Sequence, residues 1–385
     1  MMTNRLKSTA TILGLGLGIF TAEAMYSGNE RFYREVVMPA LHLLVPDGEK
    51  AHVLAVRALH YGVGPQVSRD AFQGLQRTVF GLKFTHPVGV AAGFDKDGEA
   101  VMGLLKAGFS HVEVGTVTPH PQPGNSRPRV FRWKEREAVI NRYGFNSQGH
   151  DAVYDRLKGR PWEGRGIVGV NLGCNKTSPD PIADFVAGVT KFGNVADYLV
   201  INVSSPNTPG LRSLQNKERL RELLSSVLRA RSQLNKRTPI LLKISPDESD
   251  QCLEEIVEVA MSPTTRVDGL IVSNTTLISN AEAAACGAVP VDPDVALSDA
   301  VWGGLSGRPL LEKSTACLAR VSVLTRGQLP LIGVGGISSA EDAIEKLKAG
   351  ASLVQLYTSM IYQGPPVVSR VARGLDELRD PTVKP

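Results

Sequence analysis

Cysteine is sparse in this sequence of 385 residues, which contains only Cys174, Cys252, Cys286 and Cys317. The four residues are far apart, and they form neither a CxxC pair nor any other spacing typical of metal ligands. A disulfide framework and a structural zinc site are therefore not expected. The thiols should be reduced, as they are in proteins of a reducing compartment.

Runs of one charge sign are also absent. The net charge is +5, and the Lys and Arg residues are scattered rather than gathered in runs interleaved with aromatic residues. This distribution argues against a nucleic-acid partner. The hydrophobic content of 42% is ordinary for a globular protein with a large core. The length does not require two domains, because α/β barrels longer than about 250 residues form single domains.

Only the N-terminal apolar run has the length of a membrane segment. Arg5 and Lys7 precede the uncharged residues 8–22, and Glu23 is the first acidic residue. A helix over residues 8–26 would be about 28 Å long, just enough to cross a hydrocarbon core of about 30 Å. We therefore expect a single membrane span. A cleaved secretory signal is the alternative, but the missing disulfides and the acid-free, base-containing start favour mitochondrial import.

Two amphipathic helices are expected directly after this segment. Apolar residues at helical spacing predict a first helix over residues 32–44, which is kinked or interrupted at Pro39. Asp47 is a plausible N-cap for a second helix over residues 48–59. Such helices could lie at a membrane surface and form the mouth of a tunnel for a lipid-soluble molecule. Simple packing against the main domain explains the pattern equally well.

Eight short apolar runs alternate with helical segments beyond about residue 80. They are residues 88–92, 111–117, 167–172, 198–203, 240–244, 269–273, 331–334 and 353–356. This alternation predicts a (β/α)8 TIM barrel. A doubly wound sheet is the alternative, but it would require a phosphate-binding glycine turn after its first strand. The long Pro- and Arg-rich segment 118–139 predicts an extra hairpin, and an Ala-rich insertion over residues 278–302 separates the sixth strand from its helix.

Chemistry in such a barrel gathers at the C-terminal ends of the strands. Those ends carry small residues, amides, hydroxyls and two lysines: Ala91, Ala92, Gly93, Lys96, Thr116, Asn171, Asn202, Ser205, Lys243, Asn274, Thr275, Gly335, Gly336, Tyr357 and Thr358. A carboxylate pair and a His/Asp/Cys set are both missing, which argues against glycosidase chemistry and a catalytic metal. We interpret Asp95 and Asp97, in a nearby Gly-rich turn, as turn and cap residues.

The segment 198–210, YLVINVSSPNTPG, carries a buried strand into a polar loop punctuated by prolines. Asn202, Ser204, Ser205, Asn207 and Thr208 supply neutral donors and acceptors there, without a carboxylate. Ordinary turn chemistry is the alternative interpretation of this loop.

Glycine clusters near the last two strands predict a phosphate site. GVGGIS (residues 333–338) opens a helix, and GGLSG (residues 303–307) would allow a close approach of the backbone. FMN fits such a site as a flat phosphorylated cofactor. Lys243 could stabilise negative charge on its reduced ring, while Lys96 could meet a carboxylate or the flavin. A strand-end lysine also suits a Schiff-base aldolase, which is an alternative from residue type alone.

The motifs taken together resemble those of class 2 dihydroorotate dehydrogenases. They include AAGFDKDGEA, GTVTPHPQPGNSRPRVFR, NRYGFNSQG, VNLGCNKTS, INVSSPNTPGLRSLQ, LLKISPD, SNTT, GGLSGRPL and GVGGISSAEDAIEKLKAGASLVQLYTS, within a similarity over about residues 31–368. The resemblance implies oxidation of dihydroorotate to orotate on FMN, with electrons passed to ubiquinone. It also implies a role in pyrimidine biosynthesis and a location at the mitochondrial inner membrane.

The resemblance further implies a role for each site residue. Residues that match FMN contacts are Ala92, Gly93, Thr116, Asn171, Asn202, Lys243, Ser273, Gly307, Gly336, Tyr357 and Thr358. Residues that match orotate contacts are Lys96, Asn141, Tyr143, Gly144, Phe145, Asn202, Asn207, Asn274 and Thr275. Ser205 matches the general base, which would pass its proton onward through water or a hydroxyl such as that of Thr208. His52, Arg132 and Tyr357 match the polar lining of the quinone tunnel. His42 stands where glutamine is common in the family, and the Ala-rich insertion is a second departure from the pattern.

The same resemblance divides the chain into four parts. We expect an import signal and transmembrane helix over residues 1–28, a helical quinone-tunnel domain over 29–68, an FMN-binding barrel over 69–378 and a flexible tail over 379–385. A fumarate- or NAD-linked enzyme of the same fold is a rival, against which Ser205 and the tunnel-like helices speak. A non-catalytic, membrane-tethered barrel is a second rival, which the intact set of strand-end residues disfavours.

Overall fold

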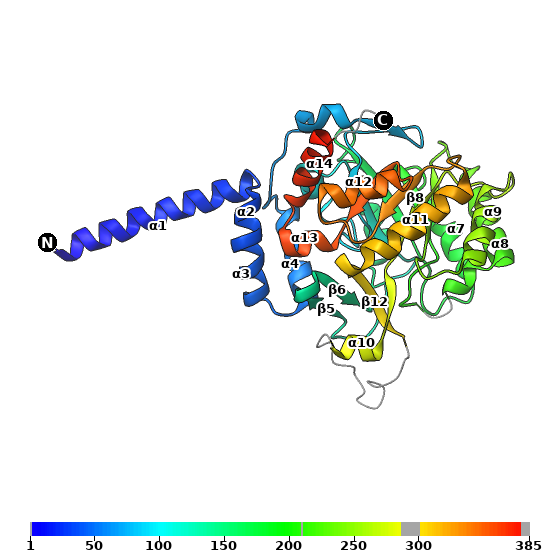
Figure 1. Cartoon of the computed structure of the whole chain (residues 1–385), viewed down its shortest axis with the longest axis horizontal. Helices are drawn as coiled ribbons and strands as arrows, with labels where there is room; N and C mark the ends of the chain where they lie inside the picture. Colours follow the sequence, from blue (N-terminus) through cyan, green and yellow to red (C-terminus); the bar gives the residue numbers. More distant parts are fainter. Residues whose placement is uncertain (1, 209–210, 286–300, 379–385) are drawn as a thin grey trace.

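A closed barrel of eight parallel strands forms the centre of the molecule (Figure 1). The computed structural model describes residues 2–208, 211–285 and 301–378. The barrel strands are β3 (Val88–Val90), β4 (His111–Val117), β7 (Ile167–Leu172), β8 (Tyr198–Asn202), β9 (Ile240–Ile244), β10 (Gly269–Val272), β13 (Leu331–Val334) and β14 (Leu353–Leu356), and their spatial order is β10-β13-β14-β3-β4-β7-β8-β9. The predicted (β/α)8 fold is confirmed. The predicted strands begin at the observed residues, since each run of β-branched and apolar residues is bounded by polar or turn residues.

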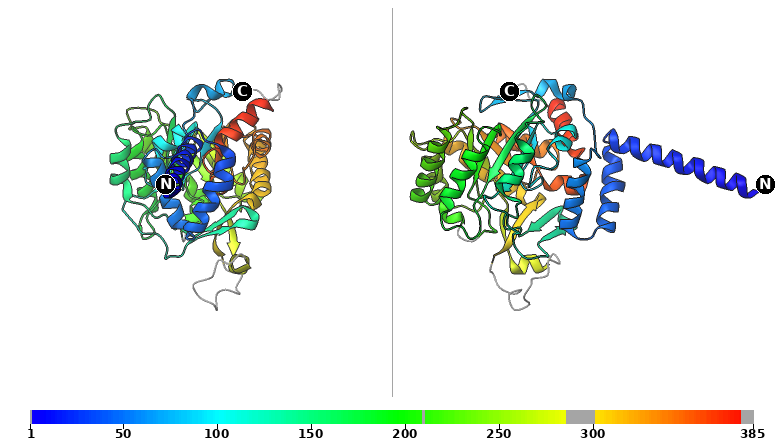
Figure 2. Two further views of the ribbon diagram at one scale, coloured as in Figure 1. Left: turned by 90° about the vertical axis from the view of Figure 1, so that its left-hand side faces the viewer. Right: turned by 180° about the vertical axis from the view of Figure 1, so that it is seen from behind.

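Helices surround this barrel on its outer face (Figure 2). They are α5 (Val101–Lys106), α6 (Gly149–Leu157), α7 (Pro181–Phe192), α8 (Lys217–Arg231), α9 (Asp250–Met261), α11 (Leu311–Thr325), α12 (Ala340–Lys348), α13 (Thr358–Gln363) and α14 (Val367–Glu377). The large core cluster lies between strands and helices and includes Phe185, Leu199 and Leu242. A smaller cluster, with Val200 and Leu241, fills the barrel interior. Alternate residues of each strand therefore face the two layers.

A short hairpin that the sequence analysis did not predict closes the N-terminal end of the barrel. Its strands are β1 (Arg77–Val79) and β2 (Leu82–Phe84), joined through Phe80 and Gly81 at positive φ. Phe84 is 1% exposed and belongs to the inner core cluster. The hairpin acts as an apolar plug, so that the barrel is open only at the opposite end.

A second, antiparallel sheet lies at the open end, with strand order β11-β12-β6-β5. The hairpin of β5 (Val130–Trp133) and β6 (Ala138–Asn141) confirms the extra hairpin predicted in segment 118–139. The Ala-rich insertion contributes the end of β11 (Thr276–Ser279), α10 (Asn280–Ala285) and the start of β12 (Val301–Gly307). Its residues 286–300, like the expected tail 379–385, lie outside the described residues.

The two helices expected after the N-terminal segment are present. The first consists of α2 (Glu30–Phe32), a π-helical turn (Tyr33–Val37) and α3 (Met38–Leu44). The π-turn directly precedes Pro39, whose missing N–H and bulky ring disturb the preceding turn of a helix. The second helix is α4 (Gly48–His60), and Asp47 Oδ1 accepts the N–H of Lys50 at 2.7 Å as its N-cap.

Helix α4 is fixed to the barrel by a buried ion pair and a close helix contact. Glu49 accepts hydrogen bonds from Arg129 Nε at 2.9 Å and Arg129 Nη2 at 2.7 Å, and a further one from Arg127 Nη2 at 2.8 Å. On the other face of α4, a Cβ atom at Gly103 of α5 would lie 2.2 Å from the carbonyl oxygen of Leu59. Only glycine permits this approach of the two helix backbones.

Helix α1 (Met2–Tyr26) extends away from the body of the molecule in Figures 1 and 2. Within the described residues, no helix combines the length and the apolar character needed to cross a membrane. No described helix therefore shows the expected span over residues 8–26, which stays a prediction. Three glycines, Gly14, Gly16 and Gly18, and several threonines alternate with the leucines and isoleucines of this helix and lower its hydropathy.

Three of the four cysteines, Cys174, Cys252 and Cys317, are free thiols, as expected. Cys286 lies outside the described residues.

Candidate active site

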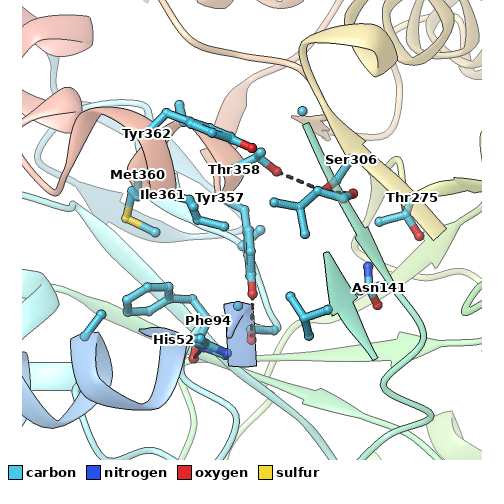
Figure 3. Close-up of a pocket in the computed structure, with 18 of the residues that line it drawn as sticks. His52, Phe94, Asn141, Thr275, Ser306, Tyr357, Thr358, Met360, Ile361 and Tyr362 are labelled. Atoms are coloured by element: carbon cyan, nitrogen blue, oxygen red, sulfur yellow. Dashed lines mark hydrogen bonds between the residues drawn. The ribbon is translucent and has the colours of Figure 1, made fainter. Parts of the chain in front are cut away.

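A cavity of about 390 Å³ lies at the open end of the barrel and continues between helices α3 and α4. The helices contribute apolar side chains such as Leu41, Ala55 and Leu59. The predicted residues on its wall are His52, Ala92, Gly93, Lys96, Thr116, Arg132, Asn141, Tyr143, Gly144, Phe145, Asn202, Ser205, Asn207, Lys243, Ser273, Asn274, Thr275, Gly307, Gly336, Tyr357 and Thr358. Figure 3 shows several of these side chains around a common space. Asn171 is the predicted contact that lies beneath this wall rather than on it.

The floor of the cavity is a chain of hydrogen-bonded amides. Asn202 Nδ2 donates to Thr116 Oγ1 at 2.9 Å and to Asn171 Oδ1 at 3.1 Å, and Thr116 Oγ1 donates to Asn171 Oδ1 at 2.6 Å. Asn274 Nδ2 donates to Asn202 Oδ1 at 3.2 Å and to Ser204 Oγ at 2.9 Å. Each of these residues ends a barrel strand or directly follows one, so the fold brings them together. Because every amide is held by neighbours, the floor is preorganised for a ligand with fixed donor and acceptor positions.

A buried carboxylate that the sequence analysis missed supports this floor. Glu113 of β4 is 0% exposed and accepts hydrogen bonds from Asn171 Nδ2 and Gln355 Nε2, both at 2.8 Å. Lys243 Nζ lies 3.8 Å from Glu113 Oε1. Glu113 therefore balances the charge of Lys243 and orients the Asn171 amide, since an ionised carboxylate only accepts. The available signal was a charged residue inside the otherwise apolar strand HVEVGTV.

The loop after β8 places Ser205 at the cavity wall. Ser205 is 7% exposed, and its Oγ accepts the N–H of Asn207 at 3.3 Å. Asn207 Nδ2 donates to both the backbone oxygen and Oδ1 of Asn141, each at 3.2 Å. Thr208 Oγ1 is buried and has no hydrogen-bond partner among the described residues, which exclude the following residues 209–210. A buried hydroxyl without a partner is uncommon, so Thr208 is available to a water molecule or ligand.

Lys96 and Tyr143 form a stacked pair on one side of the cavity. Lys96 Nζ lies 4.3 Å from the centre of the Tyr143 ring. Burial is the main cause that lowers the pKa of Lys96 to about 8. At neutral pH this lysine is mostly charged, and no carboxylate lies within 4.0 Å of it in the described chain. It is therefore suited to meet an anionic ligand.

Asp95 and Asp97 have the turn role predicted for them, but neither is the N-cap of a helix, since those positions are Ala100 for α5 and Gln148 for α6. The carboxylate of Asp95 accepts the N–H groups of Glu99 and Ala100 at 2.8 Å each. Asp97 Oδ1 accepts the N–H of Gln148 at 2.9 Å. Burial raises the pKa of Asp95 to about 6. Both carboxylates hold the loop that carries Lys96.

The helical side of the cavity contains a neutral histidine. His52 Nδ1 lies 2.9 Å from Tyr143 Oη, and its Nε2 lies 2.6 Å from the Phe94 carbonyl oxygen. A carbonyl can only accept, so Nε2 carries the proton and Nδ1 accepts from the tyrosine hydroxyl. Burial lowers the pKa of His52 to about 4, which agrees with the neutral form. Tyr357, which lies beside it in Figure 3, donates its hydroxyl to Gly93 O at 3.3 Å.

Arg132 of β5 connects the second sheet to the turn between α3 and α4. Its Nη2 donates to the carbonyl oxygens of Val45 at 3.1 Å and Pro46 at 2.6 Å. It lines the same cavity as His42, whose pKa is lowered to about 4 by burial first and by Arg132 second. The cavity mouth is therefore held by an arginine that the hairpin supplies.

Glycine turns line the opposite wall. Gly307, Gly335 and Gly336 have φ of 95°, 115° and 80°, and a Cβ at Gly307 would lie 2.4 Å from the Glu137 carbonyl oxygen. The N–H groups of Gly335 and Gly336 make no hydrogen bond within the described chain. The start of α12 is capped by its own residues, because Ser339 and Asp342 form a capping box. Donors to an anion would thus come from the glycine turn rather than from the helix start.

The charged side chains that line the cavity are mostly basic. Lys96, Arg132, Lys243 and Arg308 contribute positive charge, and Glu137 is the acidic lining residue. Such a site favours an anionic ligand. The amide floor, the glycine wall and the apolar helices provide three different surfaces in one cavity.

Comparison with known proteins gives consistent relatives. A sequence model of the family described as dihydroorotate dehydrogenase matches residues 74–378. The chain is 50% identical over 385 residues to the mouse protein named "Dihydroorotate dehydrogenase (quinone), mitochondrial", an alignment that covers 98% of this chain and 94% of the mouse protein. It is also 50% identical over 337 residues to a Parvibaculum lavamentivorans protein named "Dihydroorotate dehydrogenase (quinone)", with 88% and 91% of the two chains covered.

Solved structures agree with this similarity. The crystal structure of DHODH from Eimeria tenella in complex with ferulenol superposes with a TM-score of 0.78 at 38% identity, covering 87% of this chain and 93% of that chain. The ligand-free structure from the same organism gives a TM-score of 0.77 at 39% identity, with 86% and 96% covered.

Proposed function

Because this chain belongs to the dihydroorotate dehydrogenase family, we propose that it oxidises dihydroorotate to orotate and passes the two electrons to a quinone, which becomes a quinol. One observation carries the proposal. A single cavity joins an amide-rich floor suited to a small polar ring with an apolar passage between α3 and α4 suited to a lipid-soluble molecule. The reaction is the quinone-linked step of pyrimidine biosynthesis.

The cofactor in our proposal is FMN. The cavity wall fits its phosphate, since Gly335 and Gly336 present unpaired N–H groups and their φ values require glycine. Gly307, Tyr357 and Thr358 complete this end. Ala92, Gly93, Thr116, Asn202, Lys243 and Ser273 hold the ring, and Asn171 acts through Thr116 and Asn202. When bound, the flavin would accept a hydride equivalent from the substrate and release electrons to the quinone.

The substrate lies against the asparagine side of the cavity. Asn141, Asn202, Asn207 and Asn274 hold its amide groups, and Lys96 pairs with its carboxylate. Tyr143, Gly144, Phe145 and Thr275 shape the remaining wall. The hydrogen bonds from Asn207 to Asn141 keep these two amides in register before the substrate arrives.

Ser205 is the general base of the proposed reaction. Its Oγ takes the proton from the substrate carbon next to the one that loses the hydride. A serine hydroxyl is weakly basic, so it must pass a proton onward as it accepts one. The unpartnered Thr208 Oγ1 is a suitable next acceptor, either directly or through a water molecule.

The quinone enters between α3 and α4. His52, Arg132 and Tyr357 form its polar end, and neutral His52 avoids placing a charge beside an apolar molecule. Leu43 and Leu44 of α3 are 78% and 79% exposed, and Leu54 of α4 is 48% exposed. These apolar side chains support docking of residues 29–68 on a membrane surface, with residues 69–378 forming the catalytic barrel.

We propose that the protein is located at the mitochondrial inner membrane. The name of the mouse relative and the basic start of the chain, which has no acidic residue before Glu23, support this location. The relatives in Rhizobium leguminosarum and Parvibaculum lavamentivorans are bacterial, so the family also works outside mitochondria. The support for mitochondrial import therefore comes mainly from the basic residues Arg5 and Lys7.

Anaerobic mixing of the purified protein with dihydroorotate tests the proposal. The absorbance of oxidised flavin should bleach and should return when a short-chain ubiquinone is added. Fumarate or NAD added in place of the quinone should leave the flavin reduced. A protein without a flavin spectrum, or one whose flavin does not respond to dihydroorotate, would contradict the proposed function.

A further inference from the structure

Lys346 is a fully buried lysine behind the cavity wall. It lies on α12 and is 0% exposed. Its Nζ donates to Ser314 Oγ at 2.5 Å and makes a longer contact of 3.4 Å to the Leu311 carbonyl oxygen. No carboxylate oxygen lies within 4.0 Å of this ammonium group in the described part of the chain. A buried ammonium without an anion is unfavourable, so its presence requires an explanation.

Two other buried cations near the cavity, Arg129 and Lys243, do have anionic partners. Arg129 pairs with Glu49 at 2.7 Å, and Lys243 lies 3.8 Å from Glu113. Asp342, one turn before Lys346 on the same helix, is already used, since it accepts from the N–H and hydroxyl of Ser338 at 2.8 and 2.9 Å. Lys346 thus differs from Arg129 and Lys243, because no carboxylate lies beside it in the described part of the chain. It shares this property with Lys96, which faces the cavity directly.

The position of Lys346 indicates where an anion would lie. Ser314 Oγ, which accepts from Lys346, lies 3.0 Å from the carbonyl oxygen of Gly335. A Cβ at Gly335 would lie 2.7 Å from the same Ser314 Oγ, and a Cβ at Gly336 would lie 2.4 Å from Leu311 Cα. The glycine turn therefore rests directly on the first turn of α11. Ser314 thus lies between Lys346 and the glycine turn and bonds to both. The cavity side of this turn presents the two unpaired N–H groups of Gly335 and Gly336.

We propose that Lys346 is a positioning residue that makes the site select a phosphorylated flavin over one without a phosphate. Its charge attracts the phosphate through the glycine turn, and its bond to Ser314 holds that turn in place. The lysine does not line the cavity and does not touch the ligand. This inference rests on the proposed function, because it assumes that the glycine wall receives the phosphate of FMN.

The charge state of Lys346 is consistent with this role. Burial lowers its pKa to about 7, and the nearby Cys317, Asp342 and Glu345 oppose that shift only in part. A phosphate on the other side of the turn would favour the charged form, since an opposite charge raises the pKa of a lysine. The bound ligand would then supply the counter-charge that the protein does not.

Binding of two flavins that differ only in the phosphate tests the proposal. Flavin-free protein would be titrated with FMN and with riboflavin, and quenching of flavin fluorescence would give both dissociation constants. Lys346→Met, which keeps the length of the side chain, should weaken FMN binding by about 10- to 100-fold, the effect of losing one charge at short range in a partly buried site. Riboflavin binding should change by less than about 2-fold on the same reasoning.

Two further variants separate charge from structure. Lys346→Gln keeps a donor for Ser314 Oγ but removes the charge, so it should show the same selective loss. Lys348→Met changes an exposed lysine on the same helix and should leave both constants unchanged. Thermal unfolding of the flavin-free proteins provides a check on folding. Replacement of an unpaired buried charge by Met should not lower the melting temperature.

Each remaining outcome counts against the proposal. Equal weakening of FMN and riboflavin would assign Lys346 a purely structural role, and unchanged FMN affinity would show that its charge does not reach the site. Failure of both Lys346 variants to fold would also overturn the proposal in favour of a structural role. Wild-type protein that binds neither flavin would instead contradict the proposed function itself.

Discussion

The hydrogen-bond partners of Ser205 and Thr208 determine how these hydroxyl groups could move a proton. Ser205 has no ionised group in hydrogen-bond contact, and its Oγ is occupied by the N–H of Asn207 on one side only. Thr208 Oγ1 remains unpartnered in the described chain, within the same short loop. A weak base next to an open hydroxyl can work as a proton relay, whereas a base held by a carboxylate would not need one.

Substitution of Ser205 tests this relay. Ser205→Ala should slow flavin reduction by dihydroorotate by about 10² to 10⁴, the range typical of general base catalysis. Binding should persist because Asn141, Asn202, Asn207 and Asn274 remain in place. Stopped-flow bleaching of the flavin under anaerobic conditions measures the rate.

Ser205→Cys provides the matched variant. A thiol with an ordinary pKa of about 8.5 can itself accept the proton, so part of the rate should return and should rise with pH between about 6 and 10. If Ser205→Ala reduced its flavin at the wild-type rate, Ser205 would have no part in the chemistry.

Secondary-structure elements were predictable where the sequence pattern was local. The barrel strands are apolar runs between polar turns, and Asp47 marked the start of α4 because an N-cap acts within its own turn. Strand β12 was missed because GGLSG reads as a loop, and its strand conformation depends on pairing of Gly304 with Asn141 from far along the chain. The strands β1 and β2 have three residues each, which is too short to show the alternation of apolar and polar residues by which a strand is predicted.

In the candidate site, too, features that depend on local sequence were predicted and features that depend on distant partners were not. Residues at strand ends were predicted to meet, since a closed barrel brings all eight ends together, and the cavity wall contains nearly all of them. Glu113 was not predicted, because nothing in its own strand shows that Asn171 of β7, Lys243 of β9 and Gln355 of β14 lie near it in the barrel. Side-chain partners across a barrel depend on register, which the sequence of one strand does not specify.

Arg132 links the β5–β6 hairpin to the turn between α3 and α4. Substitution of Arg132 should therefore affect the quinone half-reaction and not the reduction of the flavin. Arg132→Ala removes the hydrogen bonds to Val45 and Pro46 and the cation near the quinone end. Quinone-dependent turnover should fall by about tenfold, the loss expected for one or two hydrogen bonds to a charged group. Flavin reduction by dihydroorotate should stay within about 2-fold, since the amide floor is untouched.

Arg136→Ala serves as the control, because Arg136 is exposed on the same hairpin and packs over Trp133. Steady-state assays with a soluble quinone and single-turnover mixing separate the two half-reactions. Equal losses in both would place Arg132 in the shared part of the site.

The whole molecule consists of a rigid barrel with one helix that extends from it. Among the residues whose side chains the structure describes, Met25 is the residue of α1 that lines the cavity, so the flavin site should not depend on the rest of this helix. Removal of residues 1–28 should leave a flavin-containing enzyme with unchanged flavin reduction and less protein in the membrane fraction. Sedimentation with vesicles and the visible spectrum measure the two properties. Loss of flavin in the truncated protein would contradict this separation.

Buried histidines should make the whole fold sensitive to acid. Burial lowers the pKa of His86 to about 4 and that of His111 to about 3, and His86 adds to the effect on His111. In the unfolded chain both would titrate near about 6.5. The unfolded state therefore binds more protons below that pH. Stability is fully present above about pH 6.5 and is lost as the pH falls toward 4, at about 1.4 kcal/mol per pH unit for each histidine.

Denaturant unfolding between pH 4.5 and 7.5 measures this dependence. His86→Gln should reduce the slope of the unfolding free energy against pH by about 1.4 kcal/mol per pH unit, the contribution of one proton, even if the fold is less stable overall. Identical slopes for wild type and His86→Gln would show that His86 does not drive the acid response.

The contact between α4 and α5 has a consequence for heredity. Gly103 lies in a helix outside the cavity, yet a methyl group there would meet the Leu59 carbonyl oxygen at 2.2 Å and push α4 outward. The displaced helix carries His52, so a missense allele encoding alanine would damage the quinone passage while sparing the dihydroorotate side. Under the proposed function, such an allele would encode a folded protein that keeps its flavin but passes electrons to the quinone poorly. A ranking of variants by their distance from Ser205 would therefore overlook this position.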